Sequence, residues 1–293
     1  EIGASVRGMD VTIAGRLSKT SFGVLANNPA SAKDLAARIK TPAQAHGVAN
    51  IKTEEVLLSL KDRDLNREQI TLALRHVVSR FADGKLKAQP GTNLTEAFEQ
   101  LMSETITRAQ GFCATVADGK FDLAFEPIVD LKSMVTVHYE ALTRFQPGQS
   151  PADTIRFAED LGLADFFDLA LAIKFFSLLE NDPGIIASIA INVSGRSIAN
   201  PSSFAMLEGL LQRHKVFAKR VLIEITETVE MTDLAAADKA IQGLRKMGYR
   251  VGIDDFGAGA ATQHYLDALS VDFIKVDGSL INKTGKSEAD DAY

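Results

Sequence analysis

The feature that most constrains the fold is a regular alternation of short apolar runs and longer helical segments from residue 121 onward. The runs, which have the length and composition of buried strands, are 121–129, 135–145, 185–193, 220–226, 249–255 and 273–277. Segments with apolar residues at helical spacing fall between the later runs, at about 153–180, 198–214, 233–247 and 261–269. Strands that alternate with helices predict a parallel sheet with right-handed crossovers, as in a barrel or a doubly wound sheet.

Two adjacent carboxylates, Asp254 and Asp255, follow the apolar run in the segment RVGIDDFGAG at 250–259. Neighbouring side chains on a strand point to opposite faces, so both aspartates cannot be buried in one apolar core. At the carboxyl end of a strand both can face the mouth of the sheet, where oxygen ligands bind Mg²⁺ or Mn²⁺. Taken alone, the pair is better explained as a solvated acidic turn, and the neighbouring strands decide against that explanation.

Polar side chains recur within or just beyond the other expected strands. They are Glu140, Asn192, Glu224 followed by Glu227, and Lys275 followed by Asp277. Each has an ordinary explanation when taken singly, since Asn192 could cap a helix and Glu224 could pair with a lysine. Together they lie in apolar runs that must be buried, where unpaired charges cost several kcal/mol each. Their joint occurrence predicts a metal site at one face of the sheet.

These residues belong to a series of motifs that resembles the EAL domain family, whose members hydrolyse or bind cyclic di-GMP. In chain order the motifs are FEPIVD at 125–130, YEALTR at 139–144, INVS at 191–194, IEITE at 223–227, IDDFG at 253–257 and IKVD at 274–277. Their order and spacing agree with the family from residue 125 to residue 277.

The resemblance implies a centre of two divalent cations, Mg²⁺ or Mn²⁺, with Ca²⁺ expected to inhibit. The positions that match metal ligands are Glu140, Asn192, Glu224, Asp254 and Asp255. Asp255 would bridge to the second cation or hold it. Two cations lower the pKa of a bound water, neutralise the phosphodiester and stabilise an in-line displacement. The implied product is the linear dinucleotide pGpG.

The resemblance also implies catalytic and substrate-binding positions. The catalytic ones are Lys275, which would orient the attacking water and offset charge on the phosphate, Glu227, which would hold the loop after Asp255, and Asp255 itself. The substrate-binding ones are Glu126, Leu142, Arg144 and Asp277. Among these, Arg144 would grip a ligand phosphate.

The sequence departs from the family pattern at three places. Glu126 replaces the family's glutamine and places an acid near an anionic ligand. The loop AGAATQ at 258–263 lacks the family's sequence motif for this loop, which helps to recruit the second metal. The last two strands of the family, with a glutamate that completes its metal site, have no counterpart. The expected fold is therefore α/β, an EAL-type (β/α) barrel whose last two strands are absent from this chain. We expect the chain to be truncated or only partly ordered.

The N-terminal part resembles a degenerate, partial GGDEF diguanylate cyclase domain. The resemblance lies in GRLSKTSFGVL at 15–25, which contains a polar turn at 16–21 and the second of two strands expected at 11–14 and 22–25. Residues 18–21, Ser-Lys-Thr-Ser, stand where that family has glycines and acids. The glycines allow close approach of a nucleotide and the acids hold Mg²⁺, so we expect no cyclase activity. Further elements are expected as a helix at 31–40, a strand at 55–60 and a helix at 66–81.

These resemblances predict that the chain consists of two domains and a segment that connects them. Residues 1–90 form the GGDEF-like remnant, which is α/β, and residues 91–118 contain a connecting helix with apolar residues at helical spacing from 94 to 117. Residues 119–293 form the EAL domain, which is incomplete at its C-terminal end.

Composition restricts the partners. The net charge of −6 and the pI near 5.5 argue against binding to a DNA or RNA backbone. Cys113 is the only cysteine, which excludes disulfides and indicates a reducing compartment. The most apolar helical segment, 161–179, is interrupted by Asp165, Asp168 and Lys174, which favours a buried helix over a membrane span. We expect a cytoplasmic protein, and a tether to the inner membrane through segments outside this chain stays open.

Three hypotheses about function remain open. The near-complete ligand set favours an enzyme that hydrolyses cyclic di-GMP. The altered loop and Glu126 favour a silent receptor that binds cyclic di-GMP and signals to a protein effector. A scaffold that binds no nucleotide is the third, and a homodimer through the EAL-like half is compatible with all of them.

Overall fold

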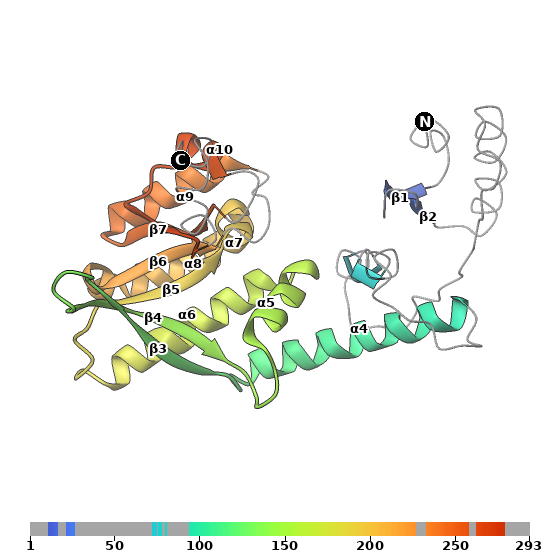
Figure 1. The fold of residues 1–293 in the computed structure, drawn as a ribbon, viewed down its shortest axis with the longest axis horizontal. Helices are drawn as coiled ribbons and strands as arrows, with labels where there is room; N and C mark the ends of the chain where they lie inside the picture. Colours follow the sequence, from blue (N-terminus) through green and yellow to red (C-terminus); the bar gives the residue numbers. More distant parts are fainter. Residues whose placement is uncertain are drawn as a thin grey trace. The chain divides into compact units, whose positions relative to one another are not determined.

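The computed structural model describes residues 11–16, 22–26, 72–74, 76–77, 80, 94–226, 233–257 and 262–278 (Figure 1). The chain divides into two compact units, residues 1–111 and residues 112–293.

Unit 1 contains an antiparallel hairpin. β1 (Val11–Arg16) pairs with β2 (Phe22–Ala26), and Ala14 lies opposite Val24. The two strands predicted on either side of a polar turn are therefore present.

Helical residues follow later in unit 1. The described residues 72–74, 76–77 and 80 are helical and fall within the helix predicted at 66–81. α4 (Leu94–Ala117) has the bounds predicted for the connecting helix. The helix predicted at 31–40 and the strand predicted at 55–60 lie outside the described residues.

Unit 2 is built on one curled sheet. Its strands are β3 (Asp122–Val129), β4 (Thr136–Arg144), β5 (Ile189–Ser194), β6 (Val221–Thr226), β7 (Arg250–Phe256) and β8 (Phe273–Val276). They lie side by side in chain order, and each pairing from β4 to β8 is parallel. The predicted α/β architecture with part of a (β/α) barrel is confirmed for this unit.

The first strand pair corrects the expectation of a wholly parallel sheet. β3 and β4 are antiparallel, with Glu126 opposite Glu140. No helix separates them, because a tight turn follows β3, in which Oδ1 of Asp130 accepts hydrogen bonds from the N–H and the hydroxyl of Ser133. Two strands joined by so short a connection can pair only in antiparallel fashion.

Two predicted helices are each broken in two. The region predicted as one helix at 153–180 contains α5 (Pro151–Asp160) and α6 (Ala164–Asn181). Gly162 separates them with a φ of 67°, a conformation that ends a helix and that glycine adopts without strain.

The second break lies between α7 (Gly195–Ala199) and α8 (Pro201–Arg213), within the helix predicted at 198–214. Asn200 caps α8 by accepting hydrogen bonds from the N–H groups of Ser202 and Ser203, and Pro201 occupies the first helical position. A capping asparagine followed by proline is a helix start, which explains the break.

Two of the remaining helices, α9 (Leu234–Met247) and α10 (Thr262–Ala268), follow the prediction closely. The short 3₁₀ helix η1 (Lys215–Arg220) was not predicted. Gly248 ends α9 in the left-handed region at a φ of 101°. Within the ranges that the structure describes, we find no helix that combines the length and the apolar character needed to cross a bilayer.

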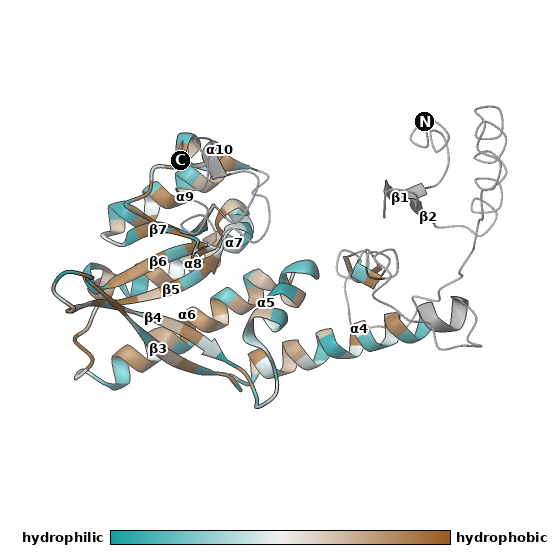
Figure 2. Ribbon diagram, viewed as in Figure 1, coloured by the Kyte–Doolittle hydropathy of each residue, from teal (hydrophilic) through white to brown (hydrophobic). Residues whose placement is uncertain are grey.

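The core of unit 2 lies between the sheet and its helices. The central strands β5 and β6 are almost entirely buried, and they are predominantly apolar (Figure 2). At one end, the rings of Phe112, Phe121, Phe145 and Phe167 pack with centroids 5.6 to 6.4 Å apart. Phe112 lies in the last part of α4, and the residues of this helix from 112 onward belong to unit 2.

A buried carboxylate joins three elements behind the end of β5. Oδ2 of Asp168 on α6 accepts hydrogen bonds from the N–H of Ser194 at 2.9 Å and its hydroxyl at 2.7 Å. It also accepts one from the hydroxyl of Ser197 on α7 at 2.6 Å. Asp168 is 6 % exposed, and burial raises its pKa to about 6 although these hydrogen bonds lower it. The network fixes the strand end that carries Asn192.

We predict that Asp168 makes the protein less stable as the pH rises from about 4 to about 6. The folded state holds the carboxyl proton up to a pKa of about 6, whereas the ordinary value is 3.8. Between these values the unfolded chain binds fewer protons, so the free energy of unfolding falls with pH. Asp168→Asn removes this titration. From about pH 4 to about pH 6, the free energy of unfolding of the variant should therefore rise by up to about 3 kcal/mol relative to that of the wild type. Urea unfolding at several pH values measures this gain, and a stability difference that does not change with pH would contradict the prediction.

Candidate metal centre

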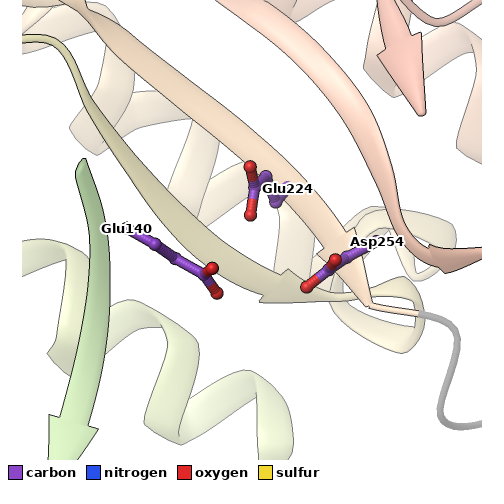
Figure 3. Close-up of side chains that lie close together, drawn as sticks. All are labelled: Glu140, Glu224 and Asp254. Atoms are coloured by element: carbon purple, nitrogen blue, oxygen red, sulfur yellow. The ribbon is translucent and has the colours of Figure 1, made fainter. Parts of the chain in front are cut away.

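Three carboxylates from three strands converge toward the carboxyl ends of the sheet. They are Glu140 on β4, Glu224 on β6 and Asp254 on β7, and one ligand oxygen from each lies within 4.8 Å of those of the others. Figure 3 shows the side chains pointing toward one another. Glu224 is fully buried and Asp254 is 7 % exposed. Buried carboxylates this close repel one another unless a cation lies among them.

The strand register explains why these residues meet. Asn192 on β5 lies opposite Glu224, and Glu224 lies opposite Gly252 on β7, two residues before Asp254. Glu140 lies two residues before the position on β4 that is level with Asn192. Since side chains two residues apart share a face, all four face the inside of the curled sheet. The steps of two residues follow the stagger of strands in a barrel.

Lys275 on β8 supplies the cation in this structure. Its Nζ lies 2.9 Å from Oε2 of Glu140, 2.8 Å from Oε2 of Glu224 and 2.9 Å from Oδ1 of Asp254. Burial lowers the pKa of Lys275, but hydrogen bonds to the three carboxylates outweigh that effect and raise it above its ordinary value. The ammonium thus occupies the centre of the carboxylate cluster.

One ammonium does not neutralise three carboxylates, and Glu224 shows the excess charge. Burial raises the pKa of Glu224 to about 7, and the charges of Asp254 and Glu140 add to that rise while Lys275 opposes it. The cluster therefore holds negative charge that a divalent cation would offset.

Two buried oxygens at the cluster have no hydrogen-bond partner among the described residues. They are Oε1 of Glu224 and Oδ1 of Asn192. The amide of Asn192 donates a hydrogen bond of 2.8 Å to Oε1 of Glu140, which orients its own oxygen away from that carboxylate. Unpartnered buried oxygens beside carboxylates are suited to a hard divalent cation, so the side chains present fit such an ion.

The chain at Asp255 leaves regular strand geometry. Asp255 has a φ of 53°, and the pairing of β7 with β8 shifts register between Ile253 and Phe256. This bulge breaks the alternation of side chains and allows adjacent aspartates at one strand end. Burial, Asp254 and Asp277 all raise the pKa of Asp255. Asp255 itself is exposed and does not belong to the three-carboxylate cluster.

The predicted substrate positions lie on the strands that border the cluster. Leu142 and Arg144 follow Glu140 at intervals of two residues on β4, so they share its face and extend toward the mouth. Arg144 is exposed, and its Nη1 donates a hydrogen bond to the carbonyl of Thr143. Glu126 is exposed on β3.

Of the two other predicted positions, the structure describes Asp277 but not Glu227. The N–H of Asp277 donates to the carbonyl of Phe256, which ties the end of β8 to the end of β7. Glu227 and residues 258–261 lie outside the described residues.

The sequence did not identify His138 as part of the site. Its Nε2 lies 3.8 Å from Oε1 of Glu224 and has no hydrogen-bond partner among the described residues. Burial lowers the pKa of His138, and the charges of Lys275 and Arg250 lower it further. His138 precedes Glu140 by two residues and so lies on the same face of β4, and this spacing could have predicted that it borders the site.

Comparisons with known proteins agree with the motif series. The model of the family described as "EAL domain" matches residues 105–293. Cyclic di-GMP phosphodiesterase PdeF of Escherichia coli is 28 % identical over 178 residues, which cover 58 % of this chain and 23 % of that protein. Cyclic di-GMP phosphodiesterase PdeB of Shewanella oneidensis is 29 % identical over 185 residues, with coverage of 60 % and 21 %. The chain thus spans less than a quarter of the length of these relatives.

A solved structure shares the fold of unit 2. The FimX EAL domain of Xanthomonas citri, in complex with cyclic di-GMP, aligns with a TM-score of 0.53 at 17 % identity. The alignment covers 64 % of this chain and 76 % of that one. At this identity the likeness concerns the fold.

We predict that replacing Lys275 makes folding depend on a divalent cation. In Lys275→Met three carboxylates lose the ammonium that contacts them all, and removing one partner of a buried ion pair costs about 3–5 kcal/mol. A cation that binds only the folded state restores stability by mass action. Thermal unfolding should show a large loss in chelator and a rise with Mg²⁺ or Mn²⁺ that exceeds the rise in the wild type. The exposed Lys246→Met serves as the control, and equal responses of both variants to the cation would contradict the prediction.

Proposed function

The chain belongs to the EAL domain family, and from this premise we propose that it hydrolyses cyclic di-GMP to pGpG in a metal-dependent reaction. The observation that carries the proposal is the convergence of Glu140, Glu224 and Asp254, the residues to which the family resemblance assigns metal binding. Two relatives named as cyclic di-GMP phosphodiesterases match 58 % and 60 % of the chain. Because the chain covers only part of those proteins, the activity of the whole protein is part of the proposal.

The proposed metal ligands are the three clustered carboxylates together with Oδ1 of Asn192. Oxygen ligands of this kind suit Mg²⁺ or Mn²⁺, with Ca²⁺ as an inhibitor. Such a cation, when bound, lowers the pKa of a coordinated water and neutralises the phosphodiester. Asp255, exposed beside the cluster, is proposed to hold a second ion.

The other side chains position the substrate and the water. Arg144 stands beyond Glu140 on the same strand face and is proposed to hold a phosphate of the ligand. Leu142 and Asp277 line the same mouth. Lys275 is proposed to orient the attacking water and to offset charge that grows on the phosphate, and Glu227 to hold the loop after Asp255.

A receptor that binds cyclic di-GMP without hydrolysis is the second candidate. Two observations favour it. Lys275 already forms ion pairs with all three carboxylates, so it competes with a cation for their oxygens. Glu126, which lies opposite Glu140 on the neighbouring strand, adds an acid beside an anionic ligand. In this case the bound ligand would act through a protein effector, and a homodimer through the EAL domain stays a prediction in both cases.

The first test separates phosphate binding from catalysis. Arg144→Ala removes charge-assisted hydrogen bonds worth about 1.5–3 kcal/mol each, so cyclic di-GMP should bind roughly tenfold to a hundredfold more weakly in either candidate. Glu140→Gln should abolish hydrolysis in an enzyme while binding measured in Ca²⁺ is largely kept.

The measurements are calorimetric titration of both variants and a hydrolysis assay at matched Mg²⁺. Arg213→Ala, at the exposed end of α8, is the control for loss of one surface arginine. A wild type that binds but does not hydrolyse selects the receptor. Unchanged affinity in Arg144→Ala would contradict the proposed phosphate contact in both candidates, and a wild type that does not bind cyclic di-GMP would leave a scaffold that binds no nucleotide.

The second test concerns residues 1–90, which we propose to be a GGDEF-like remnant without cyclase activity. The basis is the Ser-Lys-Thr-Ser sequence at 18–21 in place of glycines and acids. The full chain should therefore make no cyclic di-GMP from GTP and Mg²⁺. The assay is best done in the Glu140→Gln background, where any product would escape hydrolysis. Detectable cyclic di-GMP would refute this part of the proposal.

A further inference from the structure

Exposed apolar side chains gather at the end of unit 2 opposite the carboxylate cluster. They form what we call the amino-end patch, because they lie at the amino ends of the strands: Leu131, Met134, Val135, Val137, Ile186 and Val216. Their exposed fractions range from 57 % for Val137 to 86 % for Leu131. Single exposed apolar residues are ordinary, but a group on one surface marks an interaction site.

The segments that carry the patch are joined to one another by hydrogen bonds. Val137 lies on β4 next to the segment that enters β5, where the N–H of Tyr139 donates to the carbonyl of Ser188. The guanidinium of Arg220, at the end of η1, donates to the carbonyl of Ile185, which joins η1 to the same segment. The β3–β4 hairpin and the α6–β5 connection lie at the same edge of unit 2, on the left in Figure 1. Figure 2 shows that this connection is largely apolar.

The tip of the hairpin is held in a fixed shape. Asp130 accepts three hydrogen bonds through Oδ1, from the N–H of Lys132 and from the N–H and hydroxyl of Ser133. Met134 has a φ of 56°, and the N–H of Asp130 bonds to the carbonyl of Val135. Leu131 and Met134 therefore project from a structured turn that loses little conformational freedom when it is inserted into a partner.

Cations surround the patch although the chain carries a net charge of −6. The exposed ones at this end are Lys132, Arg213, Lys215, Lys219, Lys246 and Arg250. The acids at this end are fewer: Asp130 at the hairpin tip, Glu180 and Asp182 at the end of α6, and Asp272, which pairs with Arg245. The amino end of the sheet is thus apolar and positive, whereas the carboxyl end is acidic.

We propose that the amino-end patch docks unit 2 on an anionic lipid surface. Leu131 and Met134 would enter the boundary between headgroups and acyl chains, and Lys132, Lys215 and Lys219 would contact the headgroups. Apolar side chains flanked by lysines are the combination that interfacial binding requires. Docking by this end leaves the mouth with the carboxylate cluster facing solution, and it does not depend on the proposed function.

Two other occupants fit the patch less well. A second copy bound through the same surface would place the lysines of one chain against those of the other, which is repulsive. An apolar protein partner requires a groove or a flat core with a polar rim, whereas these side chains project from a turn and from two connections.

The experiment uses the absence of tryptophan from the chain. Leu131→Trp places a single fluorescent probe at the hairpin tip of the full chain. Its emission should shift to the blue with vesicles of phosphatidylcholine and phosphatidylglycerol, and less or not at all with phosphatidylcholine alone. Adding Lys132→Glu should weaken vesicle binding at least about tenfold, because each lysine near an anionic surface contributes about 1 kcal/mol and the reversal counts twice.

Met206→Trp is the matched control, since Met206 is a 58 % exposed apolar residue on α8. Its emission should stay unchanged, and high salt should release the Leu131→Trp protein from the vesicles. The proposal is overturned by equal shifts at both positions, by binding that ignores lipid charge, or by the lack of any shift. It is also overturned if the Leu131→Trp emission is already blue-shifted without vesicles, because the patch is then covered by the protein itself or by a second copy, which light scattering distinguishes.

Discussion

The contact of one ammonium group with three buried carboxylates is the constraint on which the rest of unit 2 depends. Lys275 on β8 reaches Glu140 on β4, 135 residues earlier in the chain. The strands β5, β6 and β7 lie between them in the sheet. In a flat sheet, strands four places apart are separated by roughly 19 Å, which is beyond the reach of the two side chains. The ion pairs can form only because the sheet curls, and they hold the first and last parallel strands toward a common axis.

Burying three carboxylates together costs free energy of folding unless a cation is present among them. Glu224 is fully buried within the most apolar strand of the sheet, and removing its charge partners would leave it to take up a proton. Lys275 offsets part of the negative charge of the cluster, and its ammonium lies among the oxygens that would coordinate a metal. The same side chain therefore underlies both functional candidates, as a catalytic group in an enzyme and as a substitute cation in a receptor.

The two ends of the sheet are chemically opposite, and the topology accounts for it. Parallel strands place all carboxyl ends on one side, where acids collect at Glu140, Glu224, Asp254 and Asp255. The helices run back the other way, so their C-terminal ends lie at the amino ends of the strands, where cations such as Arg213, Arg245 and Lys246 offset the helix dipoles. One end is thus acidic, as the proposed metal site requires, while the other is apolar and positive, as the proposed docking surface requires.

The sequence by itself determined the strands, the order of the polar residues along them and the family, because buried strands and strand-end motifs are local patterns. It also gave the reason why Asp254 and Asp255 must lie at a strand end. It did not reveal the antiparallel start at β3, since strand composition carries no direction, or the helix break at Gly162, since apolar spacing continues across it. Only the tertiary structure showed that Lys275 lies among the carboxylates, that His138 approaches Glu224 and that Asp168 anchors Ser194. These contacts join residues far apart in the chain, and the curl and register of the sheet, which no local pattern encodes, decide which of them meet.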